Sequence, residues 1–260
     1  MDLKHKNALV GGSSDGIGKA TAIAMARAGA NVTLVARNAE KLQAVMTELE
    51  TADGQQHQVV ACNFSNPVEL KKRVDDLLPE VGAFHILVNN TGGPPAGTVL
   101  DADLSAFELA FTQHLKCNHV LTQSVVAGMK QARYGRIINV ISTSVKQPIV
   151  GLGVSNTIRG AVANWAKTLA NELGPFGITV NNVLPGATAT GRLTAIINDK
   201  AEKTGASVEQ VTEQMTQSIP ARRFAQPAEI ANAILFLSSP MASYINGINL
   251  PVDGGRTKSL

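Results

Sequence analysis

A glycine-rich segment, 11–18, lies directly after a short apolar run and directly before a stretch of helix-forming residues. Glycines permit tight backbone turns and let a ligand approach the backbone closely. The N–H groups of such a turn, with the dipole of the following helix, favour a pyrophosphate. The segment therefore predicts a dinucleotide site, the alternative being a strand–helix connection without a ligand. The residues expected to contact the dinucleotide here are Gly12, Ser13, Ser14, Asp15, Gly16, Ile17 and Gly18.

The residues after the next apolar run bear on which dinucleotide binds. NAD sites usually place an Asp or Glu about 20 residues past the glycine turn, where it bonds the ribose hydroxyls. This chain has Ala36 at that point, followed at once by Arg37. An arginine there can pair with the 2′-phosphate of NADP through charge-assisted hydrogen bonds. Asp15 argues against this, because a carboxylate would repel the phosphate, and Arg37 could instead be a solvated surface residue. We expect NADP(H) rather than NAD(H).

The elements that must position these residues alternate along the chain. Apolar runs predict strands at 7–10, 31–36, 58–62, 85–88, 136–141, 179–183 and 248–252. Helices are predicted at 19–28, 40–50, 67–78, about 107–129, 155–173 and 230–237. Strands that are apolar throughout, each followed by a helix, indicate a parallel sheet covered on both faces. Right-handed connections then predict an α/β doubly wound fold of about seven strands.

One long stretch interrupts this alternation. Between Thr190 and Pro227 the sequence is more polar and shows no clear strand. An interruption of this length in a compact domain is usually a lid or a substrate loop. The chain shows no internal repeat, low-complexity tract or linker. We therefore expect residues 1–260 to form a single dinucleotide-binding domain with a substrate-loop insertion at about 190–227.

Composition limits the class of protein. Of 260 residues, 44% are hydrophobic and 17% charged, as in a folded globular protein. The net charge of +3 is small and scattered, so no nucleic-acid partner is expected. Two cysteines, Cys62 and Cys117, are too few for a disulfide framework and suit a reducing compartment. Neither a run of the roughly 18 apolar residues that span a bilayer nor a signal peptide is visible. We expect a cytoplasmic protein with no membrane partner.

Five motifs, in the same order, resemble those of the short-chain dehydrogenase/reductase family. They are Gly-x3-Gly-x-Gly in the turn, Asn89-Asn90-Thr91-Gly92, Gly135-Arg136-Ile137-Ile138-Asn139, Pro185-Gly186-x3-Thr190, and Val252-Asp253-Gly254-Gly255. The resemblance covers essentially the whole chain. It implies a Rossmann fold, a nicotinamide dinucleotide, a small carbonyl or alcohol substrate and no metal. It also implies a homotetramer, or a homodimer, built through the two long central helices. The further cofactor residues that it implies are Asn63, Phe64, Asn90, Thr91, Gly92, Arg159, Pro185, Gly186, Thr188 and Thr190.

The family's chemistry rests on a serine and a Tyr-x3-Lys pair, with an asparagine on the preceding long helix. By this resemblance Ser142 holds the substrate oxygen. The flanking helix matches in register, which places Ser155 and Arg159 at the Tyr and Lys positions, and His114 at the Asn position. A tyrosine titrates near 10, whereas a serine hydroxyl is a far weaker acid. Arg159 stays protonated at any working pH, so it cannot relay a proton.

Two other side chains are candidates for supplying the proton. His114 titrates near neutrality and would face the active site at the Asn position. Lys146 lies on the loop after Ser142, and burial could lower its pKa far enough for it to act as an acid. The alternatives are a packed or surface histidine and a solvated loop lysine.

Three functions stay open at this point. The favoured one is an NADP(H)-dependent reductase of carbonyls, or dehydrogenase of alcohols, with 3-oxoacyl thioester reductase as the nearest description by resemblance. The second is a dinucleotide-binding sensor or scaffold without hydride transfer. The third is a lyase or isomerase that holds the cofactor without turnover. The retained Ser142, glycine turn and Pro185-Gly186 motif favour the first, and the missing Tyr and Lys favour the others.

Overall fold

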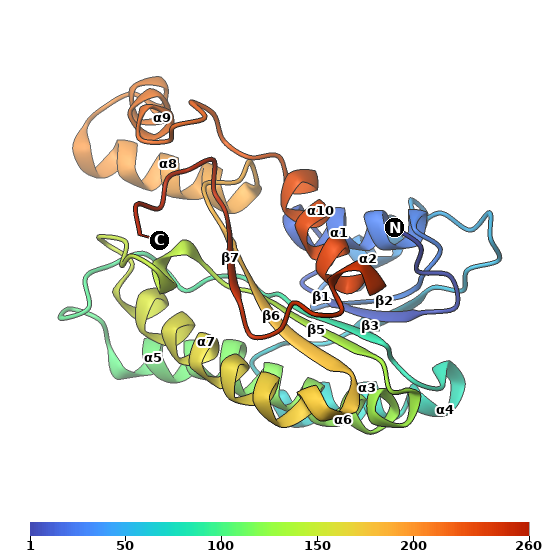
Figure 1. Cartoon of the computed structure of the whole chain (residues 1–260). Helices are drawn as coiled ribbons and strands as arrows, with labels where there is room; N and C mark the ends of the chain where they lie inside the picture. The colour runs from blue at the N-terminus through green and yellow to red at the C-terminus, as the bar shows by residue number, and fades with distance from the viewer. Residues whose placement is uncertain (260) are drawn as a thin grey trace.

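One parallel sheet carries all the predicted strands in the computed structural model, which describes residues 1–259 (Figure 1). The strands are β1 (Asn7–Gly11), β2 (Asn31–Ala36), β3 (Gln58–Ala61), β4 (Ile86–Asn89), β5 (Gly135–Val140), β6 (Ile178–Pro185) and β7 (Asn249–Val252). They pair in the order β3-β2-β1-β4-β5-β6-β7, and every pair is parallel. The predicted α/β doubly wound fold is confirmed. Because β1 lies between β2 and β4, the strand order reverses there, and ligands of such sheets bind at that carboxyl edge.

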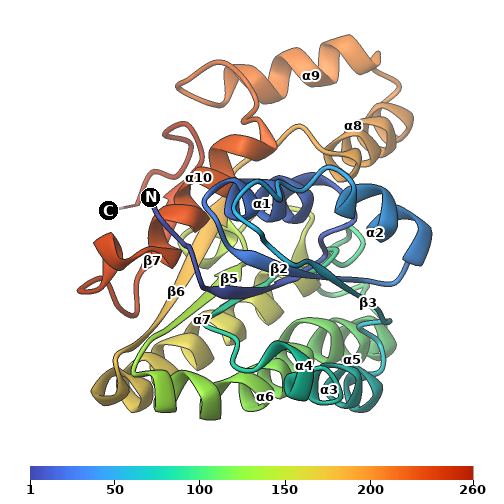
Figure 2. The ribbon, with the colours of Figure 1, turned by 90° about the vertical axis from the view of Figure 1, so that its right-hand side faces the viewer.

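Helices cover both faces of the sheet (Figures 1 and 2). On one face lie α1 (Gly16–Arg27), α2 (Ala39–Met46) and α10 (Pro227–Ser238). On the other lie α3 (Pro67–Asp75), α4 (Leu78–Val81), α5 (Leu104–Phe111), α6 (Cys117–Ala132) and α7 (Gly153–Leu173). Alternate strand residues enter the two cores: Val10 and Leu34 pack under α1, whereas Leu9 and Val35 pack on the opposite side. Burial on both faces explains why apolar residues predominate in the strands.

Polar caps set the helix starts more closely than periodicity does. The carboxylate of Asp15 accepts the Gly16 N–H at 2.7 Å, so α1 begins earlier than the predicted 19–28. Asn66 caps α3, with Pro67 at its first position. The predicted helix 67–78 is divided at its end into α3 and the short α4.

The predicted helix at about 107–129 is interrupted. A π-helical turn, Thr112–Lys116, separates α5 from α6, and the Cys117 N–H donates to the Thr112 carbonyl five residues back. Such turns add one residue to a helical stretch and change which side chains face inward. Here the turn contains the buried His114.

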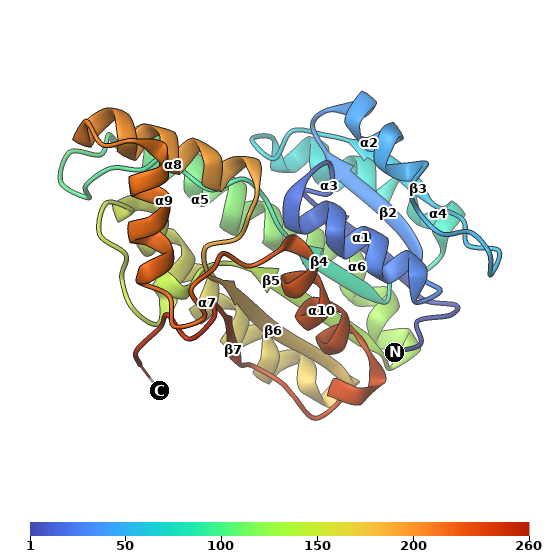
Figure 3. The same cartoon turned by 90° about the horizontal axis from the view of Figure 1, so that it is seen from above.

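Residues 190–227 contain no strand, as predicted, but they are not a loop. They form α8 (Gly191–Thr204) and α9 (Val208–Gln217), which stand apart from the layered sheet and helices at the top of Figures 1 and 2 and overlap α5 and α7 in the view from above (Figure 3). The pair has a small core in which Leu193 and Ile197 of α8 meet Val211 of α9. Ser207 and Gln210 form a capping box that begins α9. A role of this segment in substrate binding stays a prediction.

A row of asparagine amides crosses four neighbouring strands. Asn89, Asn139, Asn182 and Asn249 are opposite one another in the strand register. The Nδ2 of each donates to the Oδ1 of the next, at 2.9, 2.9 and 2.8 Å. The Oδ1 of Asn89 is buried and has no partner among residues 1–259. The row ties together the strands from which the loops of the candidate site emerge.

Candidate active site at the carboxyl edge of the sheet

The glycine turn is shaped for close backbone contact. Gly12 and Gly16 have φ values of +57° and +54°, which favour glycine. A Cβ on Gly18 would lie 2.1 Å from the Gly12 carbonyl oxygen, so α1 packs directly on the turn. The Asn90 Nδ2 donates to the Gly11 carbonyl at 3.1 Å and to the Gly12 carbonyl at 3.4 Å. The end of β4 therefore fixes the turn from the neighbouring strand.

The start of α8 faces the start of α1. Thr190 caps α8, and its Cγ2 lies 3.0 Å from where a Cβ on Gly16 would be. A groove of about 630 Å³ runs between the two helices, with Asp15, Gly16, Thr190 and Gly191 at their N-termini and apolar residues such as Ile23, Leu193 and Ile197 further along. The two helix N-termini favour an anion, whereas the Asp15 carboxylate beside them opposes one.

Some predicted cofactor residues have structural contacts of their own. The Ser13 hydroxyl is buried and accepts the Val35 N–H at 2.9 Å. The Phe64 side chain lies in the core and its carbonyl accepts the Cys117 thiol, so its side chain is not available to a ligand. Asn63 is exposed, and its Oδ1 accepts the Ser65 N–H at 3.0 Å.

The remaining cofactor residues lie on the loops at the same edge. Thr91 and Gly92 follow β4, and Pro185 ends β6. The Gly186 N–H donates to the Val252 carbonyl at 2.9 Å, and the buried Thr188 hydroxyl donates to the Gly186 carbonyl at 3.1 Å. Ser14 and Ile17 are half-buried in the glycine turn and the first turn of α1.

Arg37 stands exposed directly after β2. Its side chain makes no hydrogen bond or ion pair with any residue that the structure describes. The next residue, Asn38, caps α2 by accepting the Lys41 N–H at 2.8 Å. The Arg37 guanidinium is therefore at the sheet edge with all its donors available to a ligand.

The predicted catalytic serines lie on elements that contact each other. Ser142 precedes a 3-10 turn, Thr143–Val145, and its hydroxyl oxygen accepts the Ser144 N–H at 3.1 Å. That turn packs against α7, which carries the buried Ser155. Arg159 lies one turn further along α7, where its Nε donates to the Ser155 Oγ at 3.3 Å. Both serine hydroxyls keep their own O–H to donate to a ligand.

Arg159 is anchored in the interior. It is 8% exposed, and its Nη1 donates to the Val140 carbonyl at 3.1 Å, close to the end of β5. Burial and the charge of Arg192 lower the pKa of Arg159 to about 10, so the guanidinium stays charged at neutral pH.

His114 is 4% exposed, and its Nε2 has no hydrogen-bond partner among the described residues. Burial, followed by the positive charges of Arg159 and Arg192, lowers the pKa of His114 to about 3. A hydrogen bond with the Gly92 backbone only partly opposes this shift in pKa. At neutral pH the ring is therefore neutral, and a neutral ring has one nitrogen that accepts.

Arg192 is a member of this site that the sequence analysis missed. From the first turn of α8 its Nη1 donates to the Gly93 carbonyl at 3.0 Å and its Nη2 to the Pro94 carbonyl at 2.6 Å. The segment after Thr190 carries no recognised motif, and the only available signal was a cation at the start of a helix. Lys146 lies directly after the 3-10 turn that Ser142 precedes, and it is half-buried. The charges that lower the pKa of His114 are those of Arg159 and Arg192.

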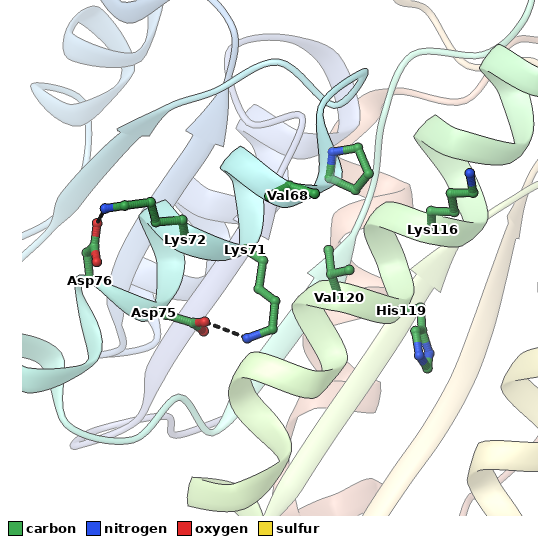
Figure 4. Close-up of a pocket in the computed structure, with 9 residues that line it drawn as sticks. Val68, Lys71, Lys72, Asp75, Asp76, Lys116, His119 and Val120 are labelled. Atoms are coloured by element: carbon green, nitrogen blue, oxygen red, sulfur yellow. Dashed lines mark hydrogen bonds and ion pairs between the residues drawn. The ribbon is translucent and has the colours of Figure 1, made fainter.

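A second hollow, of about 490 Å³, lies between α3 and α6 (Figure 4). Two of its lysines, Lys71 and Lys72, pair with Asp75 at the end of α3 and with Asp76, the residue after it. None of the predicted site residues lines it. The chemistry-bearing residues gather instead at the carboxyl edge of the sheet.

Comparison with known proteins finds similar sequences along essentially the whole chain. A family model described as Enoyl-(Acyl carrier protein) reductase matches residues 12–257. The chain is 32% identical to a 3-oxoacyl-[acyl-carrier-protein] reductase of Aquifex aeolicus over 98% of both chains. It is 31% identical to the 7alpha-hydroxysteroid dehydrogenase of Escherichia coli, covering 100% of this chain and 97% of the relative. It is 27% identical to an NADPH-dependent reductase, BacG, of Bacillus subtilis, over 99% of this chain and 100% of the relative.

Solved structures give the same result. L-Sorbose reductase from Gluconobacter frateurii, complexed with NADPH and L-sorbose, superposes with a TM-score of 0.93 at 30% identity, covering 100% of this chain and 99% of that one. YwfH, an NADPH-dependent reductase involved in bacilysin biosynthesis, gives a TM-score of 0.92 at 28% identity, covering 98% and 99%. None of the helices that the structure describes is long and apolar enough to cross a membrane.

Proposed function

The chain belongs to the short-chain dehydrogenase/reductase family of oxidoreductases, and on that premise we propose that it acts on a small carbonyl or alcohol with NADP(H) through an atypical active site. A nicotinamide dinucleotide would supply or accept the hydride. The observation that carries the proposal is the glycine turn at the carboxyl edge of the sheet, which the Asn90 side chain fixes and beside which Thr190 lies.

The choice of NADP(H) rests on Arg37. Ala36 offers no carboxylate to the ribose hydroxyls, and the unpaired guanidinium of Arg37 follows it at the sheet edge. The similar proteins whose descriptions mention NADPH support this choice. Asp15 argues against this choice, because a carboxylate that accepts the Gly16 N–H still repels a phosphate.

The remaining residues have different roles at the substrate oxygen: hydrogen bonding, charge stabilisation and proton transfer. The O–H groups of Ser142 and Ser155 donate to that oxygen. The charge of Arg159 stabilises the negative charge that develops there when a carbonyl is reduced. Arg159 also has donors left for the ribose hydroxyls. His114, with Lys146 as the alternative, accepts or supplies the proton.

The proposal is tested by adding ketones, diketones and 3-oxoacyl thioesters to purified protein with NADPH and following the absorbance of the reduced cofactor. We expect oxidation of NADPH with at least one class, and loss of it in Ser142→Ala. Tight NADPH binding without turnover on any of these compounds would instead favour a sensor or scaffold, or a lyase or isomerase that retains the cofactor.

Arg37→Ala is expected to weaken NADPH binding by about 10- to 100-fold and NADH binding by less than about twofold, because only NADPH carries the 2′-phosphate. Calorimetry with each cofactor measures both changes. Arg27→Ala, which removes an exposed arginine from the far end of α1, is the matched control. Equal losses for the two cofactors would disprove the 2′-phosphate role.

Restoring the family's residues, with Ser155→Tyr and Arg159→Lys together, is not expected to raise kcat/KM. Ser155 is 5% exposed, so a phenol ring must displace its neighbours, and overpacking of this kind costs about 1–3 kcal/mol. The lysine also lacks the planar fork by which Arg159 reaches Ser155 and Val140. Steady-state kinetics and Tm of the double variant check this. A gain of about tenfold or more would show that the present pair is a defect rather than an adaptation.

A further inference from the structure

The candidate site holds two guanidiniums and no carboxylate that balances them. None of the seven ion pairs among residues 1–259 includes Arg159 or Arg192. The charge that acts on Arg159 is that of Arg192, which is of the same sign. Arg159 is 8% exposed, whereas Arg192 is exposed. A buried charge such as that of Arg159 is unfavourable without a counter-charge, and native proteins pair such charges. The site is therefore electrostatically incomplete without a ligand.

Both guanidiniums have donors to spare. A guanidinium has five N–H groups. Arg159 uses one on Ser155 and one on Val140, and Arg192 uses one on Gly93 and one on Pro94. Three remain on each. The bonds already made hold the two planes in place from α7 and α8, so the free donors are oriented before a ligand arrives.

His114 adds an independent observation. Its Nε2 is buried without a partner, and the ring lies within electrostatic range of both arginines. A buried nitrogen of this kind needs a hydrogen-bond partner. A ligand that satisfies this nitrogen must therefore offer more than negative charge: it must also carry a donor, such as the hydroxyl of an alcohol, because the neutral ring has an accepting nitrogen.

We propose that the substrate carries a carboxylate bound by Arg192 and Arg159, so that the substrates are oxo acids or the corresponding hydroxy acids. This inference rests on the proposed function. The proposed function assigns the phosphates of the cofactor elsewhere, to the glycine turn and to Arg37. The forked donors of a guanidinium match the two oxygens of a carboxylate.

The carboxylate takes no part in the chemical step. In reduction, the hydride of NADPH adds to the ketone carbon, the C=O π bond breaks, and its oxygen takes a proton from the His114 ring, which takes up that proton from water. The ketone is reduced and the cofactor oxidised. The bound carboxylate offsets the two positive charges that now depress the pKa of His114, so the ring takes up a proton more readily when substrate is present.

The test compares each acid with its own neutral ester. The probes are 2-oxobutanoate, 3-oxobutanoate and 4-oxopentanoate, each beside its methyl ester, with NADPH and the whole protein. We expect kcat/KM of the unaltered protein to favour at least one acid over its ester by about 10- to 100-fold. Arg192→Gln should bring that ratio close to one and leave the Kd of NADPH unchanged. Lys200→Gln, which removes an exposed positive charge from the same helix, should keep the ratio.

A binding measurement separates this inference from the proposed function. If no probe is reduced, calorimetry of the same acids and esters with the NADPH complex still reports on the arginines. Tighter binding of an acid than of its ester, lost in Arg192→Gln, supports the carboxylate site even without turnover. Equal binding of acid and ester overturns it, and so does a weakened Kd for NADPH in Arg192→Gln with the acid-to-ester ratio unchanged.

Discussion

Replacing His114 by alanine is expected to lower kcat by about 100-fold or more and to change the Kd of NADPH by less than about twofold. General acid–base groups contribute about 10²- to 10⁴-fold to a rate. His114 is the buried titratable group that lies with Arg159 and Arg192, and its unpartnered Nε2 is the atom that can take or return a proton. Turnover and cofactor binding, measured on the same preparation, separate a proton-transfer role from a role in cofactor binding.

His119→Ala is the matched control, because His119 lies on α6 within two turns of His114 but is exposed. Lys146→Ala is the competing variant. Retained turnover in His114→Ala together with lost turnover in Lys146→Ala would assign proton transfer to Lys146 instead of His114. Full activity in both would assign proton transfer to water or to the substrate itself.

The low pKa of His114 also predicts a pH dependence of stability. Because the pKa is about 3 in the folded protein and 6.5 ordinarily, the unfolded chain binds the proton more readily. The contribution of neutral His114 is therefore fully present above about pH 6.5 and is lost as the pH falls toward 3. His114→Gln should flatten this part of the curve in denaturant titrations. An unchanged acid limb would mean that the ring is not held neutral by its surroundings.

Gly18→Ala is expected to weaken NADPH binding by about 100-fold and to lower Tm by on the order of 10 °C. The added methyl group would lie 2.1 Å from the Gly12 carbonyl oxygen, a backbone atom that cannot rotate away. Separating α1 from the turn costs about 3 kcal/mol of packing, which for a chain of this size gives the stated change in Tm. It also moves the N–H groups that would hold a pyrophosphate, and losing two such bonds is worth about 3 kcal/mol, or roughly 100-fold in Kd.

Gly174→Ala is the control for the substitution itself. Gly174 has a helical backbone, and a methyl group there meets the Asn246 side chain at an ordinary 3.5 Å. Its Tm and its affinity for NADPH should be close to those of the unaltered protein. If Gly18→Ala binds NADPH as tightly as Gly174→Ala, close packing of α1 on the turn is not what shapes the phosphate site.

The sheet could be predicted from the sequence because both of its faces are buried. Every strand then appears as an apolar run, and the prediction for β2, residues 31–36, matches its bounds. The glycine turn was predictable for a different reason: backbone geometry there leaves glycine as the residue of choice at Gly12 and Gly16.

The positions of the candidate catalytic residues were less predictable, because contacts between residues far apart in the sequence determine them. The π-helical turn that contains His114 has no sequence periodicity of its own. Arg192 gains its place only when α8 folds back toward Gly93 and Pro94, which are distant in the sequence. The helices of 190–227 escaped detection because their apolar positions, Leu193 and Ile197 among them, are few and bury a small core of their own.

A parallel sheet contains nothing in its backbone that distinguishes one register from the next, since every peptide unit offers the same donor and acceptor. The row of amides from Asn89 to Asn249 does distinguish the observed register, because each amide bonds to the amide opposite it. Slippage of one strand by two residues would keep its inward face buried yet place an aliphatic side chain against an amide. The row also has a polarity, because each amide must point the same way as its neighbour. Asn139 and Asn182 each stand three residues before a site residue, Ser142 and Pro185. A sheet assembled in the wrong register therefore loses amide hydrogen bonds. The loss occurs near the strand ends from which those loops emerge.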